Sequence, residues 1–305
     1  MHIQHVIADY QTRRISRSVW LIQKCLKADH SLFVIGPKGK VMIQKELGHM
    51  RRHTGRLYEP MWNPDCTILH SLSREHIKTI NRETICLQQQ ATLSPAYGVR
   101  TVAMSRWCAN KIGADDVLRP CGFSNPDRRM KAITIGLVTE CAEDADAEEG
   151  MMIKAIARAL PHVRFHLPYG TEAFRAMTGP DIGARAIYRY STEDISGACH
   201  ITLHTNRHDP TGDLVANAIL SNSVPVVCAG GAQKEFVPDE SLIYTTYHQA
   251  VRICCRLVNE AGRLDAAKEQ CGAHYREHFN MPVFRRNLIR QLSKVVANTG
   301  THAWT

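Results

Sequence analysis

The chain of 305 residues lacks the features that would place it in a membrane or carry it out of the cell. No apolar run reaches the ~18 residues that a membrane-spanning helix needs. The N-terminus, MHIQHVIADYQ, has neither the basic start nor the long apolar core of a secretory signal peptide. We therefore expect a cytoplasmic protein with no integral membrane segment.

Motifs for metal ions are also missing from the sequence. The 11 cysteines are scattered, and none belongs to a CxxC pair or to a Cys/His spacing of the zinc type. The adjacent pair Cys254 and Cys255 lies in a helical pattern, where both thiols cannot bind one tetrahedral ion. We expect reduced, mostly buried thiols and no bound metal.

Acidic residues are scarce in the first part of the chain. Residues 1–131 carry 21 Lys and Arg against 10 Asp and Glu, whereas residues 132–305 carry 17 against 19. A basic excess confined to one part of a protein predicts a polyanionic partner, either nucleic acid or an acidic membrane surface. A solvated basic face with no partner is the alternative.

Short β-branched runs alternate with helical patterns along the whole chain, which also has no short repeat and no low-complexity tract. This alternation predicts an α/β protein with parallel sheets covered by helices. A stretch with two prolines and no steady period separates two such series. We expect two Rossmann-like domains, residues 1–122 and residues 132–305 with a helical tail, joined by a linker at 123–131. A cleft between the strand ends of the two domains would be the ligand site.

The segment HDPTGDLVANAILSNSVPVV, residues 208–227, contains the strongest candidate for a binding loop. Asp209 and Asn217 lie two helical turns apart, so both can address one ligand. The N–H groups around Thr211, Gly212 and Asp213 open a helix and favour an anion. The alternative is an ordinary loop, helix and strand, with Asp209 as a helix N-cap.

With Gly230 and Gly231 further on, residues 99–245 resemble the GT-B glycosyltransferases of the group-1 type. These enzymes transfer a sugar from a nucleotide-sugar donor, retain its anomeric configuration and need no metal or other cofactor. Asp209, Pro210 and Gly212 match the opening of the family's donor motif, and Val224 to Val227 match its close. The resemblance implies that Asp209 contacts the transferred sugar. Together with the open helix N-terminus, it leads us to expect donor contacts from Thr211, Gly212, Asp213, Asn217, Gly230 and Gly231, with Arg119 and Lys234 as replacement cations.

Two departures from the family's pattern concern the charge of the donor site. Asn217 stands where the family has a second acidic residue, and an amide accepts a hydroxyl hydrogen bond less strongly than a carboxylate does. The family's diphosphate-binding Arg and Lys fall on Glu140 and Glu149, which cannot neutralise a diphosphate. Either other cations replace them, with Arg119, Arg128, Arg129, Lys131 and Lys234 as candidates, or the donor is held differently. A third possibility is that the protein has kept the fold and lost the activity.

In the first domain, basic side chains that can follow phosphates stand close to aromatic rings that can stack on bases. The expected acceptor-binding residues are Lys38, Lys40, Arg51, Arg52, Arg56 and Trp62. The alternative for this segment is an amphipathic helix whose basic side is exposed to solvent and binds no partner. His70 ends a predicted strand and is a second catalytic candidate, able to polarise a hydroxyl.

These features lead to three hypotheses. In the first, the acceptor is a hydroxymethylated pyrimidine in double-stranded DNA, as in viral DNA modification, which requires extrusion of the base. In the second, the acceptor is a lipid-linked or lipopolysaccharide glycan at a membrane surface. In the third, the chain is a noncatalytic binding module that has kept the fold and lost the donor site.

Overall fold

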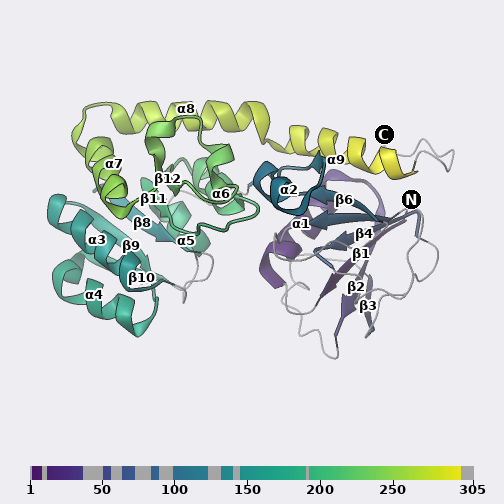
Figure 1. Cartoon of the computed structure of the whole chain (residues 1–305), viewed down its shortest axis with the longest axis horizontal. Helices are drawn as coiled ribbons and strands as arrows, with labels where there is room; N and C mark the ends of the chain where they lie inside the picture. Colours follow the sequence, from purple (N-terminus) through teal and green to yellow (C-terminus); the bar gives the residue numbers. More distant parts are fainter. Residues whose placement is uncertain are drawn as a thin grey trace. The chain divides into compact units, whose positions relative to one another are not determined.

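The computed structural model describes residues 2–8, 12–36, 51–55, 64–72, 84–88, 99–122, 132–139, 145–189 and 192–296. The chain forms two compact units, with unit 1 made of Met1–Pro120 and Met281–Thr305, and unit 2 made of Cys121–Asn280. Each unit is a parallel sheet flanked by helices (Figure 1). The predicted linker lies outside the described residues. The last helix, which we expected in the second domain, belongs to unit 1.

Unit 1 contains a seven-stranded parallel sheet in the order β3-β2-β1-β4-β5-β6-β7. Its strands are β1 His2–Ala8, β2 Asp29–Ile35, β3 Arg51–Gly55, β4 Cys66–His70, β5 Thr84–Gln88, β6 Arg100–Ala103 and β7 Asp116–Val117. Its helices are α1 Thr12–Cys25, α2 Arg106–Ile112 and α9 Met281–Val296. The central strands β4 and β5 are buried at every residue, as expected for strands covered on both faces.

The short β-branched runs of the sequence predict five of these strands, β1, β2, β4, β5 and β6, and do not predict β3 or β7. Arg51 and Arg52 lie in β3, an edge strand that pairs with β2, so the helical alternative is wrong for these two residues. The start of α2 was predicted correctly. Ser105 caps it by accepting a hydrogen bond from the Cys108 N–H at 3.0 Å, and Gly113 ends it in the left-handed conformation.

Unit 2 contains a six-stranded parallel sheet in the order β10-β9-β8-β11-β12-β13. Its strands are β8 Thr134–Val138, β9 Arg164–Pro168, β10 Ala186–Arg189, β11 Ile201–His204, β12 Val224–Cys228 and β13 Ile243–Tyr244. Its α-helices are α3 Ala147–Ala159, α4 Glu172–Ile182, α5 Thr192–Ala198, α6 Asp213–Leu220, α7 Tyr247–Asn259 and α8 Arg263–His278. Three short 3₁₀ helices are η3 Gly183–Arg185, η4 Gln233–Phe236 and η5 Glu240–Leu242.

Pro225 lies inside the buried strand β12, although proline cannot donate a hydrogen bond to a neighbouring strand. On one side β12 pairs with β11 from Val224 onward, and on the other side it pairs with β13 only at Val227 and Cys228. Pro225 therefore lies where the second ladder has not yet begun. The sheet tolerates it for that reason.

The order of strands reverses once in each sheet. In unit 1 the chain runs outward from β1 to β3 and then returns to the other side of β1 at β4. In unit 2 it runs outward from β8 to β10 and returns at β11. Open parallel sheets bind ligands beyond the carboxyl ends of the two strands at such a reversal. The residues that follow β8 and β11 are therefore the first place to look for a site in unit 2.

Candidate functional site

The side chain of Asp209 stabilises the loop between β11 and α6 by accepting hydrogen bonds from the backbone of that loop. Its Oδ1 accepts hydrogen bonds from the N–H groups of Thr211 and Gly212, both at 3.0 Å, and the side chain is 2% exposed. The residue at the N-cap of α6 is Gly212, with φ of 71°, so the alternative in which Asp209 is the N-cap of this helix is wrong. Two of the N–H groups that we expected to bind an anion are donated to Asp209. The third residue, Asp213, accepts a hydrogen bond from the Thr211 hydroxyl at 2.8 Å.

Because Gly230 and Gly231 have no side chains, the backbone of the loop after β12 can pack directly against the backbone of the loop after β11. A Cβ atom at Gly230 would lie 2.3 Å from the carbonyl oxygen of Arg207. One at Gly231, where φ is +73°, would lie 2.7 Å from the carbonyl oxygen of Asp209. Any side chain at either position would push the loop after β12 away from the loop after β11. These two glycines therefore hold the Asp209 loop in place.

Gln233 ties the same two loops together. Its buried amide nitrogen lies 3.1 Å from the carbonyl oxygens of Asn206 and Cys228 and 3.2 Å from that of Gly230. The Tyr244 hydroxyl, on β13, donates to the carbonyl oxygen of His204 at 3.1 Å. The backbone that leaves β11 is therefore held by side chains from η4 and from β13, as expected for a binding loop that needs to be preformed.

A pocket of about 180 Å³ opens beside this loop, at the strand-order reversal of unit 2. It lies where the start of α3, the loop after β11 and the β13–α7 segment meet. Its lining residues are Asp146, Glu148, Glu149, Met152, Thr205, Arg207, Tyr244 and Tyr247. The reversal of strand order therefore coincides with a pocket lined by charged and aromatic side chains.

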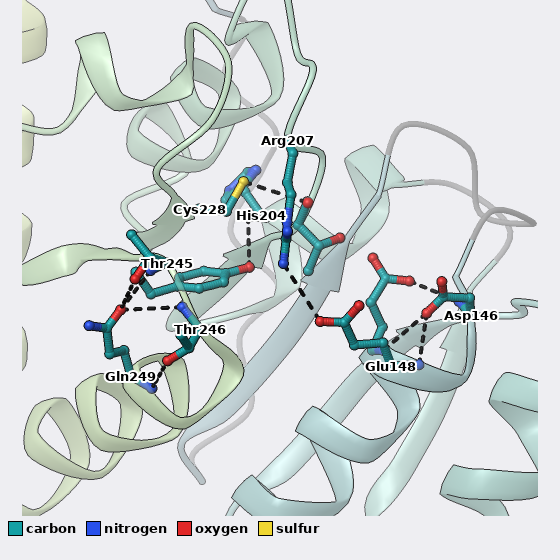
Figure 2. A network of polar contacts seen from close by, with 11 residues as sticks. Asp146, Glu148, His204, Arg207, Cys228, Thr245, Thr246 and Gln249 are labelled. Carbon is teal, nitrogen blue, oxygen red and sulfur yellow. Dashed lines mark hydrogen bonds and ion pairs between the residues drawn. The ribbon is translucent and has the colours of Figure 1, made fainter.

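The pocket contains one cation and three carboxylates. Arg207 Nη2 lies 3.6 Å from Glu148 Oε1, and each side chain is 62% exposed (Figure 2). Asp146 and Glu149 form a capping box at the start of α3, in which Glu149 Oε2 accepts the Asp146 N–H at 2.8 Å. Burial raises the pKa of the Glu149 carboxyl, and this hydrogen bond opposes the rise. The site is therefore acidic except at Arg207.

The remaining donor-site candidates are dispersed over both units. Asn217 is buried in α6, and Lys234 is exposed on η4. Arg119 follows β7 in unit 1 and is half-buried. Of the predicted residues, Asp209, Gly230 and Gly231 lie close together, in the two loops that follow β11 and β12. It places Arg207, which we did not predict, at the pocket.

The acceptor-site candidates belong to unit 1. The backbone of Arg51 and Arg52 lies in the edge strand β3. Several residues that we singled out lie outside the described part of the chain: Lys38, Lys40, Arg56, Trp62, Arg128, Arg129, Lys131 and Glu140.

His70 lies at the carboxyl end of β4, at the strand-order reversal of unit 1, and its side chain is 0% exposed. Its Nε2 is 3.1 Å from Nδ1 of His5, whose Nε2 is 3.0 Å from Nδ1 of His30. Burial lowers the pKa of His70 to about 3 and lowers that of His5 well below its usual value. His70 is thus a neutral imidazole at the end of a row of three histidines.

Sequence reasoning missed Arg207, Tyr244 and Tyr247. Arg207 stands two positions before Asp209 in the same loop, so its cationic side chain was a visible signal. The two tyrosines are visible in the sequence only as residues near a short predicted strand. Among the described residues, no three His, Cys, Asp or Glu side chains are grouped so that they could hold a metal ion. Nor does any helix in the described ranges have the length and apolarity to cross a membrane.

Comparison with solved structures decides the fold. HepE of Anabaena in complex with UDP-glucose superposes with a TM-score of 0.69 at 11% identity, over 96% of this chain and 100% of that one. A glycosyltransferase from Rickettsia africae gives a TM-score of 0.70 at 10% identity, over 98% and 99% of the two chains. The chain has the GT-B fold.

Sucrose-phosphate synthase from Thermosynechococcus elongatus shares this GT-B fold, with a TM-score of 0.70 at 11% identity, over 98% of this chain and 100% of that one. No protein-family model matches the sequence, and no curated protein matches it. The predicted GT-B architecture is thus confirmed by structure at a level of identity where sequence comparison finds nothing.

Proposed function

We propose that the protein is a glycosyltransferase that moves a sugar from a nucleotide-sugar donor to an acceptor hydroxyl. The observation that carries this proposal is the pocket at the strand-order reversal of unit 2, lined by Arg207, Glu149 and Tyr247. HepE, which shares the fold, was solved with UDP-glucose. The donor-motif resemblance around Asp209 is independent support, because it was read from the sequence alone.

The chemistry of the residues that line the pocket indicates which part of the donor each would contact. The guanidinium of Arg207 can bind phosphate oxygens with two parallel hydrogen bonds. Carboxylates such as Glu149 accept hydrogen bonds from ribose hydroxyls, and Tyr247 offers an aromatic face to a base. A pocket of about 180 Å³ is smaller than the ~300 Å³ or more of sites that enclose a whole ligand, so it takes one part of the donor.

Isothermal titration against a panel of nucleoside diphosphates and nucleotide sugars tests the proposal. At least one donor nucleotide should bind, and Arg207→Gln should weaken that binding. Arg175→Gln, which removes an exposed arginine of α4 in unit 2, is the matched control. Asp209→Asn keeps an oxygen that can close the turn and should abolish turnover. Absence of binding to every nucleotide in the panel would refute the proposal.

The finer proposal concerns the acceptor, for which we propose a hydroxymethylated pyrimidine in DNA. Its support is the charge of unit 1, which holds 22 Lys and Arg against 9 Asp and Glu, whereas unit 2 holds 16 against 20. The imbalance is larger than the sequence division indicated, because α9 adds four cations and no carboxylate to unit 1. Glucosylation of hydroxymethylated duplex DNA, followed by mass spectrometry of its nucleosides, tests this acceptor directly.

We also propose that the reaction retains the anomeric configuration of the donor sugar. The support is the resemblance of residues 99–245 to the group-1 type. NMR of the product from an α-linked donor tests it, because a β-linked product would refute retention.

A noncatalytic module is a second candidate, favoured by the carboxylates Glu148 and Glu149 in the pocket. Nucleotide binding without turnover on any acceptor, including DNA and lipid-linked glycans, would support this candidate over the enzyme.

A further inference from the structure

Helix α9 of unit 1 contains no acidic residue and has one strongly basic side. Its 16 residues, MPVFRRNLIRQLSKVV, contain four cations and neither Asp nor Glu. Phe284, Leu288 and Leu292 are buried in unit 1 and fix the rotation of the helix. Arg286 and Arg290 lie on the opposite side and are exposed. The packing of the apolar residues therefore presents the arginines to solvent.

The C-terminal end of α1 extends this basic side. Cys25 Sγ lies 3.2 Å from Met281 Sδ, and the charge of Arg285 acts on the Cys25 thiol, so the end of α1 lies against the first turn of α9. Lys24 and Lys27 are exposed at this end of α1. We call Lys24, Lys27, Arg285, Arg286 and Arg290 the α1–α9 basic surface.

One carboxylate of unit 1 faces the far end of α9. Asp116 accepts a hydrogen bond from Lys294 at 2.7 Å and also pairs with Arg100. Because Lys294 is engaged in this ion pair, it is left out of the basic surface. Within the described residues, Arg290 donates a hydrogen bond to the neutral side chain of Asn287 at 3.2 Å and pairs with no carboxylate. The charge of the two central arginines is therefore retained.

The spacing on α9 suits a chain of phosphates. Arg286 and Arg290 are four residues apart, an interval that spans about 6 Å along the helix axis. An arginine forms bidentate hydrogen bonds with a phosphate. A row of such side chains can follow a nucleic-acid backbone without reading its sequence.

The same surface fits a membrane less well. A helix that lies in a membrane interface buries an apolar face among the lipids and keeps its basic residues at the rim. The apolar face of α9 is already packed inside unit 1. In the described part of the chain, the large apolar side chains that are exposed are Met151 and Met177, and both belong to unit 2.

We propose that the α1–α9 basic surface binds the phosphate backbone of double-stranded DNA. This proposal rests on the DNA acceptor proposed above and assigns its contact to particular residues. It adds a site to those expected from the sequence, which placed acceptor contacts only between Lys38 and Trp62.

Salt dependence of binding gives a quantitative test. The probe is a fluorescein-labelled DNA duplex of mixed sequence, titrated with the full-length protein at salt concentrations from about 50 to 200 mM. Each phosphate contact contributes about −0.9 to the slope of log K against log salt. The double variant Arg286→Gln, Arg290→Gln should therefore have a slope shallower by about 1.8 and should bind more weakly at every salt concentration.

The matched control removes two exposed arginines of unit 2, with Arg175→Gln and Arg252→Gln, and should leave the slope unchanged. Equal slopes for the wild type and the α9 variant would overturn the proposed surface. If the slope changed on reversal of Arg51 and Arg52 instead, the DNA acceptor would stand and this surface would not. Binding to vesicles of phosphatidylserine together with indifference to DNA would overturn both, and nucleotide titration would still report on the donor site.

Discussion

Mild acid should destabilise unit 1 more than it destabilises an ordinary α/β domain. The reason is the pair His5 and His70, which are fully buried on adjacent strands at 0% exposure. Burial lowers the pKa of His70 from 6.5 to about 3, and lowers that of His5 well below 6.5 through burial and the charges of His70, His30 and His2. In the unfolded chain, both imidazoles regain their ordinary pKa and bind protons.

The sign of the change in stability with pH follows from the number of protons that each state binds. Between the lowered pKa and pH 6.5 the unfolded state binds more protons than the folded state, so the stability is fully present above pH 6.5 and is lost as the pH falls. A histidine whose folded pKa lies far below 5 destabilises the protein by about 2 kcal/mol at pH 5 relative to pH 7. His70, with a folded pKa of about 3, should therefore lower the free energy of unfolding by about 2 kcal/mol, and His5, whose pKa is also lowered, acts in the same direction. This is a substantial part of the ~5–15 kcal/mol that stabilises a typical domain.

Tryptophan fluorescence isolates this effect, because the tryptophans at positions 20, 62, 107 and 304 all belong to unit 1. With a urea m-value of about 2 kcal/mol per molar, the fluorescence midpoint should fall by at least about 1 M between pH 7 and pH 5. His70→Gln should remove about 1 M of that fall, which is the contribution of His70. His162→Gln, which changes an exposed histidine of unit 2, should lose none. An unchanged wild-type midpoint at pH 5 would refute the reasoning.

Three further predictions concern unit 2. Arg207→Gln should weaken nucleoside diphosphate binding about tenfold, whereas Glu148→Gln should strengthen it up to about fivefold, because the exposed ion pair at 3.6 Å competes for Arg207. Calorimetry reports both. Gly230→Ala should lower the free energy of unfolding by about 2 kcal/mol or more in urea titrations, since its Cβ would lie 2.3 Å from a carbonyl oxygen. Nucleotide affinity should rise as the pH falls toward the raised pKa of Glu149, because the neutral carboxyl no longer repels phosphate; a fall would contradict this role.

Local pattern was sufficient for the strands and for the helix at the centre of the donor motif. The runs ITLH and VPVVC are buried strands β11 and β12, as their apolar composition predicted, and DLVANAIL between them is α6. Periodicity identifies a helix but does not identify its packing partner. For that reason α9 was predicted as a helix and was assigned to the wrong unit.

The pocket could not be predicted from local sequence, because its lining residues are brought together by the order of the strands in the sheet. Glu148 and Arg207 are 59 positions apart in the sequence, and Tyr247 is 40 positions further on. They meet because β11 returns to pair with β8, and nothing in the local sequence specifies that pairing. The role of Asp209 was also hidden, since an acidic residue before a helix can cap the helix, bind a ligand or close a turn. Only the hydrogen bonds to Thr211 and Gly212 identify the turn.

The opposite charges of the two units lead to one last prediction, on salt. Both proposed ligands are anions, but unit 1 carries 22 cations against 9 carboxylates, and the pocket of unit 2 has three carboxylates beside one arginine. Salt screens charges over about 8 Å at physiological ionic strength, so it weakens attraction at the first surface and repulsion at the second. Affinity for DNA should therefore fall steeply with salt, while affinity for the donor nucleotide stays level or rises. A donor affinity that fell as steeply as the DNA affinity would show that cations other than Arg207 dominate the donor site, and the roles of Glu148 and Glu149 argued above would be wrong.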